Sequence, residues 1–428
     1  MSTRGFIRAR LVGLEARLGR LASIDHASVG IRPQDRPYAP TAAHFAAANR
    51  RLSRIERSAA ERFADLDRTW RRASHERVLV HIALVERELD RARRAFGLFF
   101  EVFGQRGTNF APALAAHDAI AEDCYAAVRE HAPHAFRGPL LKPVCYMEHG
   151  YSPATMRRGV TLSRLLGEHN PFPIIRIPWD REHPWDAVFL HEVAHNLHAD
   201  LGIWQENRQA VVRRIMGRAR DPLLASIYGR WHKEIFADMA AILLGGPAAA
   251  WGMASFLAQP SPRTLTYRPG GAHPTAYIRV LILVEMLRRI GFGSDAERLR
   301  RVWTTLYDPR RMHRIPLPLL SGSSRIVPEV VDEIVFQTRR NLAQRALADI
   351  LPFRSEDQAR IVEAGQRLAR GAREVELEPR WLVSAASYAL AARRTAPDAL
   401  SRNVIGILNE LRRERRGATP ASPTTLAA

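Results

Sequence analysis

The chain has 428 residues, of which 46% are hydrophobic and 25% are charged, as in ordinary globular proteins. This composition excludes a wholly disordered chain and a collagen-like repeat. The two cysteines, Cys124 and Cys145, are too few for a disulfide framework or a zinc cluster of thiolates. The net charge of +20 comes from arginine, because Lys142 and Lys233 are the only lysines, and it raises the question of a nucleic acid or membrane partner.

The excess charge is concentrated on the two flanks of the chain. Residues 1–110 carry a net charge of +9 and residues 291–428 a net charge of +7. Most arginines recur beside Glu or Asp at helical spacing, which is typical of solvated helix faces crossed by ion pairs. A basic helical protein that binds nucleic acid is the alternative interpretation. No apolar run is long enough for a signal peptide or a membrane span, so we expect a cytoplasmic protein.

The N-terminal region, residues 1–110, is predicted to be helical. Residues 1–22 form an amphipathic pattern, and apolar residues recur again between positions 78 and 103. Between them lies a longer stripe with apolar residues at every third or fourth position: Phe45, Ala48, Leu52, Ile55, Ala59, Phe63, Leu66 and Trp70. This stripe fits either an intramolecular helical hairpin or dimerisation through residues 45–70 as a coiled coil.

The middle region, residues 111–290, is predicted to form an α+β core in an otherwise helical chain. A helix over 112–131 is followed by three short apolar or β-branched runs, at 139–147, 156–162 and 172–178. Within the last run, Pro173 and Pro178 bracket Ile174 to Ile177, which favours a short edge strand. Residues 291–416 read as a C-terminal helical region, and residues 417–428 as a disordered tail.

Residues 191–195 read His-Glu-Val-Ala-His within an apolar segment. Pro184 and Asp186 suit the first turn of a helix there. On that helix, His191 and His195 lie one turn apart on the same face and can share a metal ion. Glu192 lies about 100° further round, beside the metal, where it can act as a base.

A catalytic zinc ion needs a third protein ligand and an open fourth position. His198 lies on the same stripe, but a straight helix places it about 10.5 Å from His191 along the axis, which is too far for one ion. The segment 231–245 offers a better ligand, because Glu234 and Asp238 share the one polar face of an otherwise apolar helix. A metal ion for Glu234 and an imidazole N–H for Asp238 would satisfy both carboxylates.

Together, His191-Glu192-x-x-His195 and Glu234-x-x-x-Asp238 resemble the motifs of the gluzincin zinc metallopeptidases, the clan typified by thermolysin. The resemblance covers about 100 residues, with a longer interval between the two motifs than in thermolysin. It implies one Zn²⁺ per chain, bound by the two histidines and Glu234, with Glu192 as general base and then proton donor. It also implies that Asp238 orients His191, and that the fold contains a small twisted sheet packed on the motif helix.

A third segment, Gly270 to Arg279, contains His273-Pro274 at the start of an apolar helix. Several HExxH peptidase families have a similar His-Pro segment followed by an arginine. The resemblance implies that His273 stabilises the oxyanion that forms on the scissile carbonyl, with Tyr277 as an alternative donor.

These patterns predict a zinc-dependent hydrolase, in particular a metallopeptidase in which a zinc-activated water attacks the peptide bond. Two alternatives stay open. The first is a zinc protein of the same fold that is inactive on peptides or hydrolyses another amide. The second is the nucleic-acid-binding protein named above, in which the motif is incidental.

Overall fold

The computed structural model describes residues 2–21, 23–136, 140–148, 154–162, 165, 167–312 and 314–417. The tail predicted to be disordered lies outside these residues from position 418 onward. The described chain is predominantly helical with one small sheet, which confirms the α+β class. It divides into two compact units: unit 1 (1–114, 144–147, 156–174) and unit 2 (115–143, 148–155, 175–428). The predicted regions 111–290 and 291–416 therefore fall largely together in unit 2.

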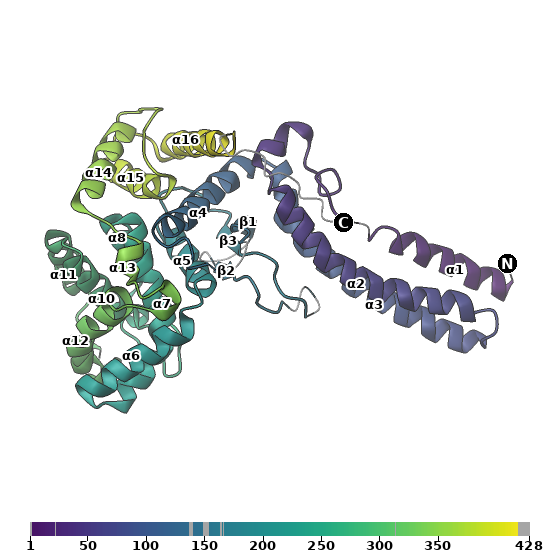
Figure 1. Cartoon of the computed structure of the whole chain (residues 1–428), viewed down its shortest axis with the longest axis horizontal. Coiled ribbons are helices and arrows are strands. Elements are labelled where there is room, and N and C mark those ends of the chain that lie inside the picture. Colours follow the sequence, from purple (N-terminus) through teal and green to yellow (C-terminus); the bar gives the residue numbers. More distant parts are fainter. Residues whose placement is uncertain are drawn as a thin grey trace. The chain divides into compact units, whose positions relative to one another are not determined.

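Unit 1 is built on a long helical hairpin (Figure 1). Its helical elements are α1 (Thr3–Leu18), η1 (Pro33–Tyr38), α2 (Ala42–Thr69), α3 (His75–Gly104) and η2 (Gln105–Gly107). The stripe predicted on α2 packs against α3 of the same chain, and six of its eight residues, including Leu52 and Leu66, are buried. The apolar surface offered as a coiled-coil interface is thus used inside the hairpin.

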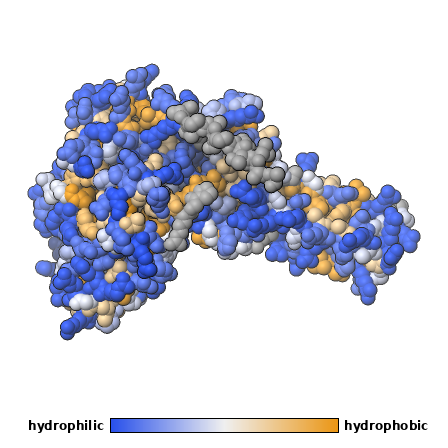
Figure 2. Space-filling view, viewed as in Figure 1, coloured by the Kyte–Doolittle hydropathy of each residue, from blue (hydrophilic) through white to orange (hydrophobic). Residues whose placement is uncertain are grey.

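Charged residues cover the outside of this hairpin. Arg10 on α1 bonds to Glu86 on α3 at 2.8 Å, and Arg17 bonds to Asp90 at 3.2 Å. These two pairs join different helices. Within α3, Arg91 lies 3.1 Å from Glu88 and Arg93 lies 3.6 Å from Asp90, which are the ion pairs at helical spacing expected of solvated helix faces. Figure 2 shows hydrophilic residues over most of the visible surface, with apolar residues gathered in patches.

The sheet has three strands: β1 (Val144–Glu148), β2 (Ala154–Met156) and β3 (Ile174–Pro178). Their order is β1-β3-β2, so the prediction of an edge strand at β3 is wrong. Pro173 precedes β3 and Pro178 is its last residue, so neither removes an amide from the middle of the strand. The carbonyl of Pro173 accepts a hydrogen bond from the Val144 amide at 3.0 Å.

Unit 2 holds the remaining helices. The first group is α4 (Ala111–His131, which begins in unit 1), α5 (Val188–Asp200), α6 (Trp204–Ala219), α7 (Pro222–Gly245), α8 (Pro247–Leu257), α9 (Ser261–Thr264), α10 (Ala276–Arg289) and α11 (Gly293–Leu306). The second group is η4 (Pro309–Arg311), α12 (Leu317–Val331), the π-helical turn η5 (Asp332–Phe336), η6 (Arg340–Leu342), α13 (Leu347–Ile350), α14 (Ser355–Ala369), α15 (Pro379–Ala391) and α16 (Pro397–Gly417).

Helix α7 is the centre of unit 2. It packs against α5, α6, α8, α10, α12 and α15, and every residue from Glu234 to Gly245 is buried. Asp221 caps its N-terminus by accepting from the Leu224 amide at 2.9 Å, and Pro222 occupies the first turn. A Cβ on Gly245 would lie 2.6 Å from Leu190 Cδ1, so the glycine allows α5 to approach closely. This packing places the two sequence motifs against each other.

None of the described helices is both long and apolar enough to cross a lipid bilayer. Cys124 and Cys145 are both buried, and no disulfide joins them.

Candidate metal centre

The two histidines of the 191–195 motif lie on one face of α5, as their spacing predicts. Their rings are 4.5 Å apart between centroids and nearly perpendicular. The helix begins at Val188, later than predicted, because Pro184 lies in a turn before it. Asp186 still serves this end of α5, since its Oδ1 accepts from the Val188 amide at 3.2 Å.

Glu234 extends from α7 toward both histidines. Its Oε2 lies 3.4 Å from His191 Nε2, and its Oε1 lies 3.3 Å from His195 Nε2. One nitrogen or oxygen from each of the three residues falls within 4.8 Å of the others. Donors that surround one zinc ion at 2.0–2.1 Å in a tetrahedron are about 3.4 Å apart. The group His191, His195 and Glu234 could therefore hold a metal ion.

Asp238 lies one turn after Glu234 on α7 and contacts His191, as the resemblance implied. Its Oδ1 is 2.9 Å from His191 Nδ1, and its side chain is almost fully buried. If Nδ1 carries the proton and donates it to this carboxylate, the Nε2 lone pair is left facing Glu234 and a metal ion. The contact thus favours one ring orientation for His191, with Nδ1 facing Asp238 and Nε2 facing Glu234.

Arg279 on α10 is a site residue to which the sequence analysis assigned no role, although it noted the arginine after the His-Pro segment. Its Nε and one terminal nitrogen donate to the two oxygens of Asp238 at 2.6 and 2.8 Å. The same terminal nitrogen lies 3.5 Å from Glu234 Oε2 and 3.2 Å from His191 Nε2. The guanidinium is 5% exposed. A buried positive charge needs an acidic partner. The arginine on this apolar helix was therefore a signal that a buried carboxylate lies nearby.

The charges of this cluster shift one another's pKa values. Burial alone would lower the pKa of His191, but Asp238 and Glu234 raise it to about 9. Burial would raise the pKa values of Glu234 and Asp238, but the histidines and Arg279 hold both below their usual range. Burial and the charge of His191 lower the pKa of His195. The carboxylates are therefore kept ionised inside the protein.

Glu192 is buried beside the cluster, pointing from α5. Burial, together with the nearby charge of Glu234, raises its pKa to about 7, while His191, Arg279 and Arg176 oppose the increase. Arg176 belongs to the central strand β3 and lies 3.6 Å from Glu148. The sequence-based assignment did not single out Arg176, although a basic residue among the isoleucines of a strand was visible.

The other candidate site residues, His273, Tyr277 and His198, differ in how far they are buried. His273 is largely exposed, with its Nε2 3.6 Å from Glu234 Oε2, so it lies at the edge of the centre. Tyr277 is buried. Burial and the nearby charge of Asp308 raise the pKa of its hydroxyl, whereas Arg310 opposes this increase. His198 is fully buried, bonds through Nε2 to Asn207 at 3.2 Å and stacks on Phe236. It is absent from the group that could hold a metal ion, in agreement with the axial-distance argument.

No protein-family model, curated protein or solved structure matches this chain.

Proposed function

We propose that this protein is a zinc-dependent hydrolase, and that its substrates are peptide bonds. The observation that carries the proposal is the convergence of His191, His195 and Glu234 from two helices, with Glu192 buried beside them. Two imidazoles and one carboxylate form the ligand set of several zinc hydrolases, in which a fourth position is left for water or substrate. When bound, the metal would activate a water molecule and polarise the scissile carbonyl.

Glu192 would move the proton in this reaction. Its position on α5, about 100° from the histidine face, keeps it out of the ligand set but next to the reacting atoms. Its carboxylate would take a proton from the attacking water and deliver it to the leaving amine. The apolar surroundings of α5 exclude bulk water, which strengthens the electrostatic interactions of these groups.

Asp238 and Arg279 would position the ligands. Asp238 holds the ring of His191 through Nδ1, and Arg279 holds Asp238 with two hydrogen bonds. His273, at the exposed edge, would donate a hydrogen bond to the oxyanion of the carbonyl. The site would therefore combine a buried, rigid ligand set with one solvent-accessible donor.

The test compares two site variants and one control variant with the wild type in metal content and in cleavage of a mixed peptide library analysed by mass spectrometry. We expect the wild type to retain about one zinc per chain, as the single ligand set requires. Glu192→Gln should retain the metal and lose hydrolysis by roughly 10²–10⁴-fold. Glu234→Ala should lose the metal, whereas Glu297→Ala, which removes an exposed carboxylate, should change neither property.

Each outcome contradicts a different part of the proposal. Wild-type protein with far less than one metal ion per chain would refute the metal centre. Full zinc retention by Glu234→Ala would refute that ligand. Zinc-loaded wild type that cleaves no peptide in the library would refute the peptidase assignment and leave hydrolysis of another amide as the alternative.

A further inference from the structure

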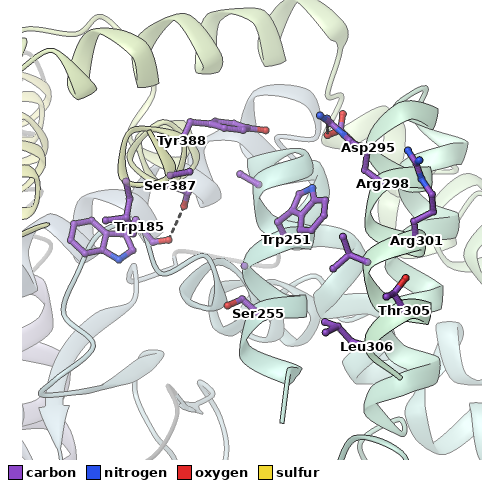
Figure 3. A pocket seen from close by; sticks show the side chains of 15 residues that line it. Trp185, Trp251, Ser255, Asp295, Arg298, Arg301, Thr305, Leu306, Ser387 and Tyr388 are labelled. Atoms are coloured by element: carbon purple, nitrogen blue, oxygen red, sulfur yellow. Dashed lines mark hydrogen bonds and ion pairs between the residues drawn. The ribbon is translucent and has the colours of Figure 1, made fainter. Parts of the chain in front are cut away.

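Unit 2 contains a hollow that is lined by none of the metal-centre residues. It has a volume of about 980 Å³. Helices α8, α11 and α15 and the segment before α5 form its walls (Figure 3). This volume is near the upper end of the range of small-molecule sites, about 300–1,000 Å³. The hollow is large enough for a ligand of its own.

Most of the wall is apolar, and part of it consists of planar aromatic rings. Trp185, Trp251 and Tyr388 contribute aromatic rings, and Val302 and Leu306 contribute aliphatic groups from α11. Val302 and Leu306 are 45% and 57% exposed, so the protein leaves much of their apolar surface open to solvent. Exposed apolar residues gathered in a concave site are typical of ligand contact.

Two hydroxyls on the α15 side already form hydrogen bonds within the protein, and the Tyr388 O–H is still able to donate. The Ser387 hydroxyl donates to the Trp185 carbonyl at 2.9 Å, and the Tyr388 hydroxyl accepts from the Gln358 amide at 2.8 Å. A polar ligand body would find few free partners there, and its desolvation would be uncompensated. This part of the hollow therefore favours an apolar body.

The opposite side carries charge. Figure 3 shows Asp295, Arg298 and Arg301 on α11, across the hollow from Trp185. Arg298 bonds to Asp295 at 2.5 Å, which neutralises one of the two arginines. Arg301 is 68% exposed, and the acid paired with it, Glu297, lies 3.9 Å away. The lining thus has one surplus positive charge with guanidinium donors available to a ligand.

We propose that this hollow binds an apolar monocarboxylate, such as a medium-chain fatty acid. The chain would lie against Trp185, Trp251 and the aliphatic residues of α11, and the carboxylate would pair with Arg301. A guanidinium matches a carboxylate with two parallel hydrogen bonds, which gives selectivity for the head group. The inference does not depend on the proposed hydrolase function, because it concerns separate residues.

The test measures binding to the full chain by calorimetry, with and without a chelator. The probes are decanoate, the neutral 1-decanol and adenosine monophosphate. We expect decanoate to bind roughly two- to fivefold more tightly than 1-decanol, because solvent screening weakens an ion pair with an exposed guanidinium. Arg301→Gln should remove most of this difference and leave 1-decanol binding unchanged. Arg300→Gln on the same helix, outside the hollow, should change neither affinity.

A second variant tests the apolar wall. Val302→Asp, at an exposed position, should weaken both decanoate and 1-decanol at least fivefold. The proposal is overturned by equal affinities for the two probes, by an Arg301→Gln variant that binds decanoate like the wild type, or by no decanoate binding at millimolar concentration. Tighter binding of adenosine monophosphate would overturn it in favour of a nucleotide site. Because binding is measured with the metal removed as well, its failure is distinct from failure of the hydrolase proposal.

Discussion

Two ion pairs of nearly equal length occupy opposite environments in this protein. On the unit 1 hairpin, Arg10 and Glu86 are 2.8 Å apart, and their side chains are 37% and 35% exposed. In the metal centre of unit 2, Arg279 and Asp238 are 2.6 Å apart, and their side chains are 6% and 1% exposed. Solvent screens the first pair, whereas burial shields the second pair from solvent. Burial, more than distance, therefore determines what each pair contributes.

The largest expected effect comes from breaking the buried pair. Arg279→Gln leaves Asp238 ionised and buried without its bidentate partner, so we expect unfolding free energy to fall by about 3–5 kcal/mol. Urea denaturation of the metal-free protein measures this loss. The double variant Arg279→Met with Asp238→Leu should recover most of it, because neither charge is then buried alone. A single variant as stable as the wild type would contradict this account of the cluster.

A smaller effect is expected from the partly buried carboxyl before α5. Burial raises the pKa of Asp186, although its bond to the Val188 amide opposes the shift. A carboxyl whose pKa is higher in the folded protein destabilises it when ionised, above the folded pKa, and this cost disappears as the pH falls toward the unfolded value. Asp186→Asn should therefore raise stability at pH 7 by roughly 1 kcal/mol.

The gain should shrink as the pH falls toward 4, which urea denaturation at several pH values would measure. Asp221→Asn, at the cap of α7, is the matched control for losing a charge at a helix N-terminus. If Asp186→Asn instead lowers stability at pH 7, the cap and the nearby positive charges outweigh burial at this position.

The smallest effect is expected on the hairpin. Removing the exposed pair with Arg10→Ala or Glu86→Ala should change stability by about 0.2–1 kcal/mol. A double-mutant cycle at low salt and at 1 M salt isolates the pair, and the coupling energy should diminish at high salt. A coupling as large as that of the buried pair would remove the contrast between the two regions.

Local patterns predicted much of the helical architecture and part of the site. The stripe from Phe45 to Trp70 predicted α2, because its period matches a buried helix face. The spacing of His191 and His195 predicted a shared face, and the lone polar pair on α7 predicted where carboxylates would gather. Each of these features belongs to a single helix, so a short stretch of sequence is enough to predict it.

Contacts between residues far apart in the sequence could not be predicted from such short stretches. Arg279 reaches Asp238 across 41 residues and His191 across 88, and no local period links these positions. The central place of β3 likewise depends on the neighbours it pairs with, whereas its prolines indicated only where the strand ends. The sequence therefore predicted the candidate metal ligands more readily than it predicted the role of Arg279, which holds Asp238.

The central place of α7 also bears on the order of synthesis. The ribosome releases α5 and α7 well before α10, so Glu234 and Asp238 emerge without the guanidinium that later neutralises them. Burying them at that stage would leave the histidines of α5 as their only partners in the cluster, without the bidentate pair that Arg279 forms with Asp238. We therefore expect the nascent α5–α7 pair to stay hydrated until Arg279 and the helices that enclose α7 have been made.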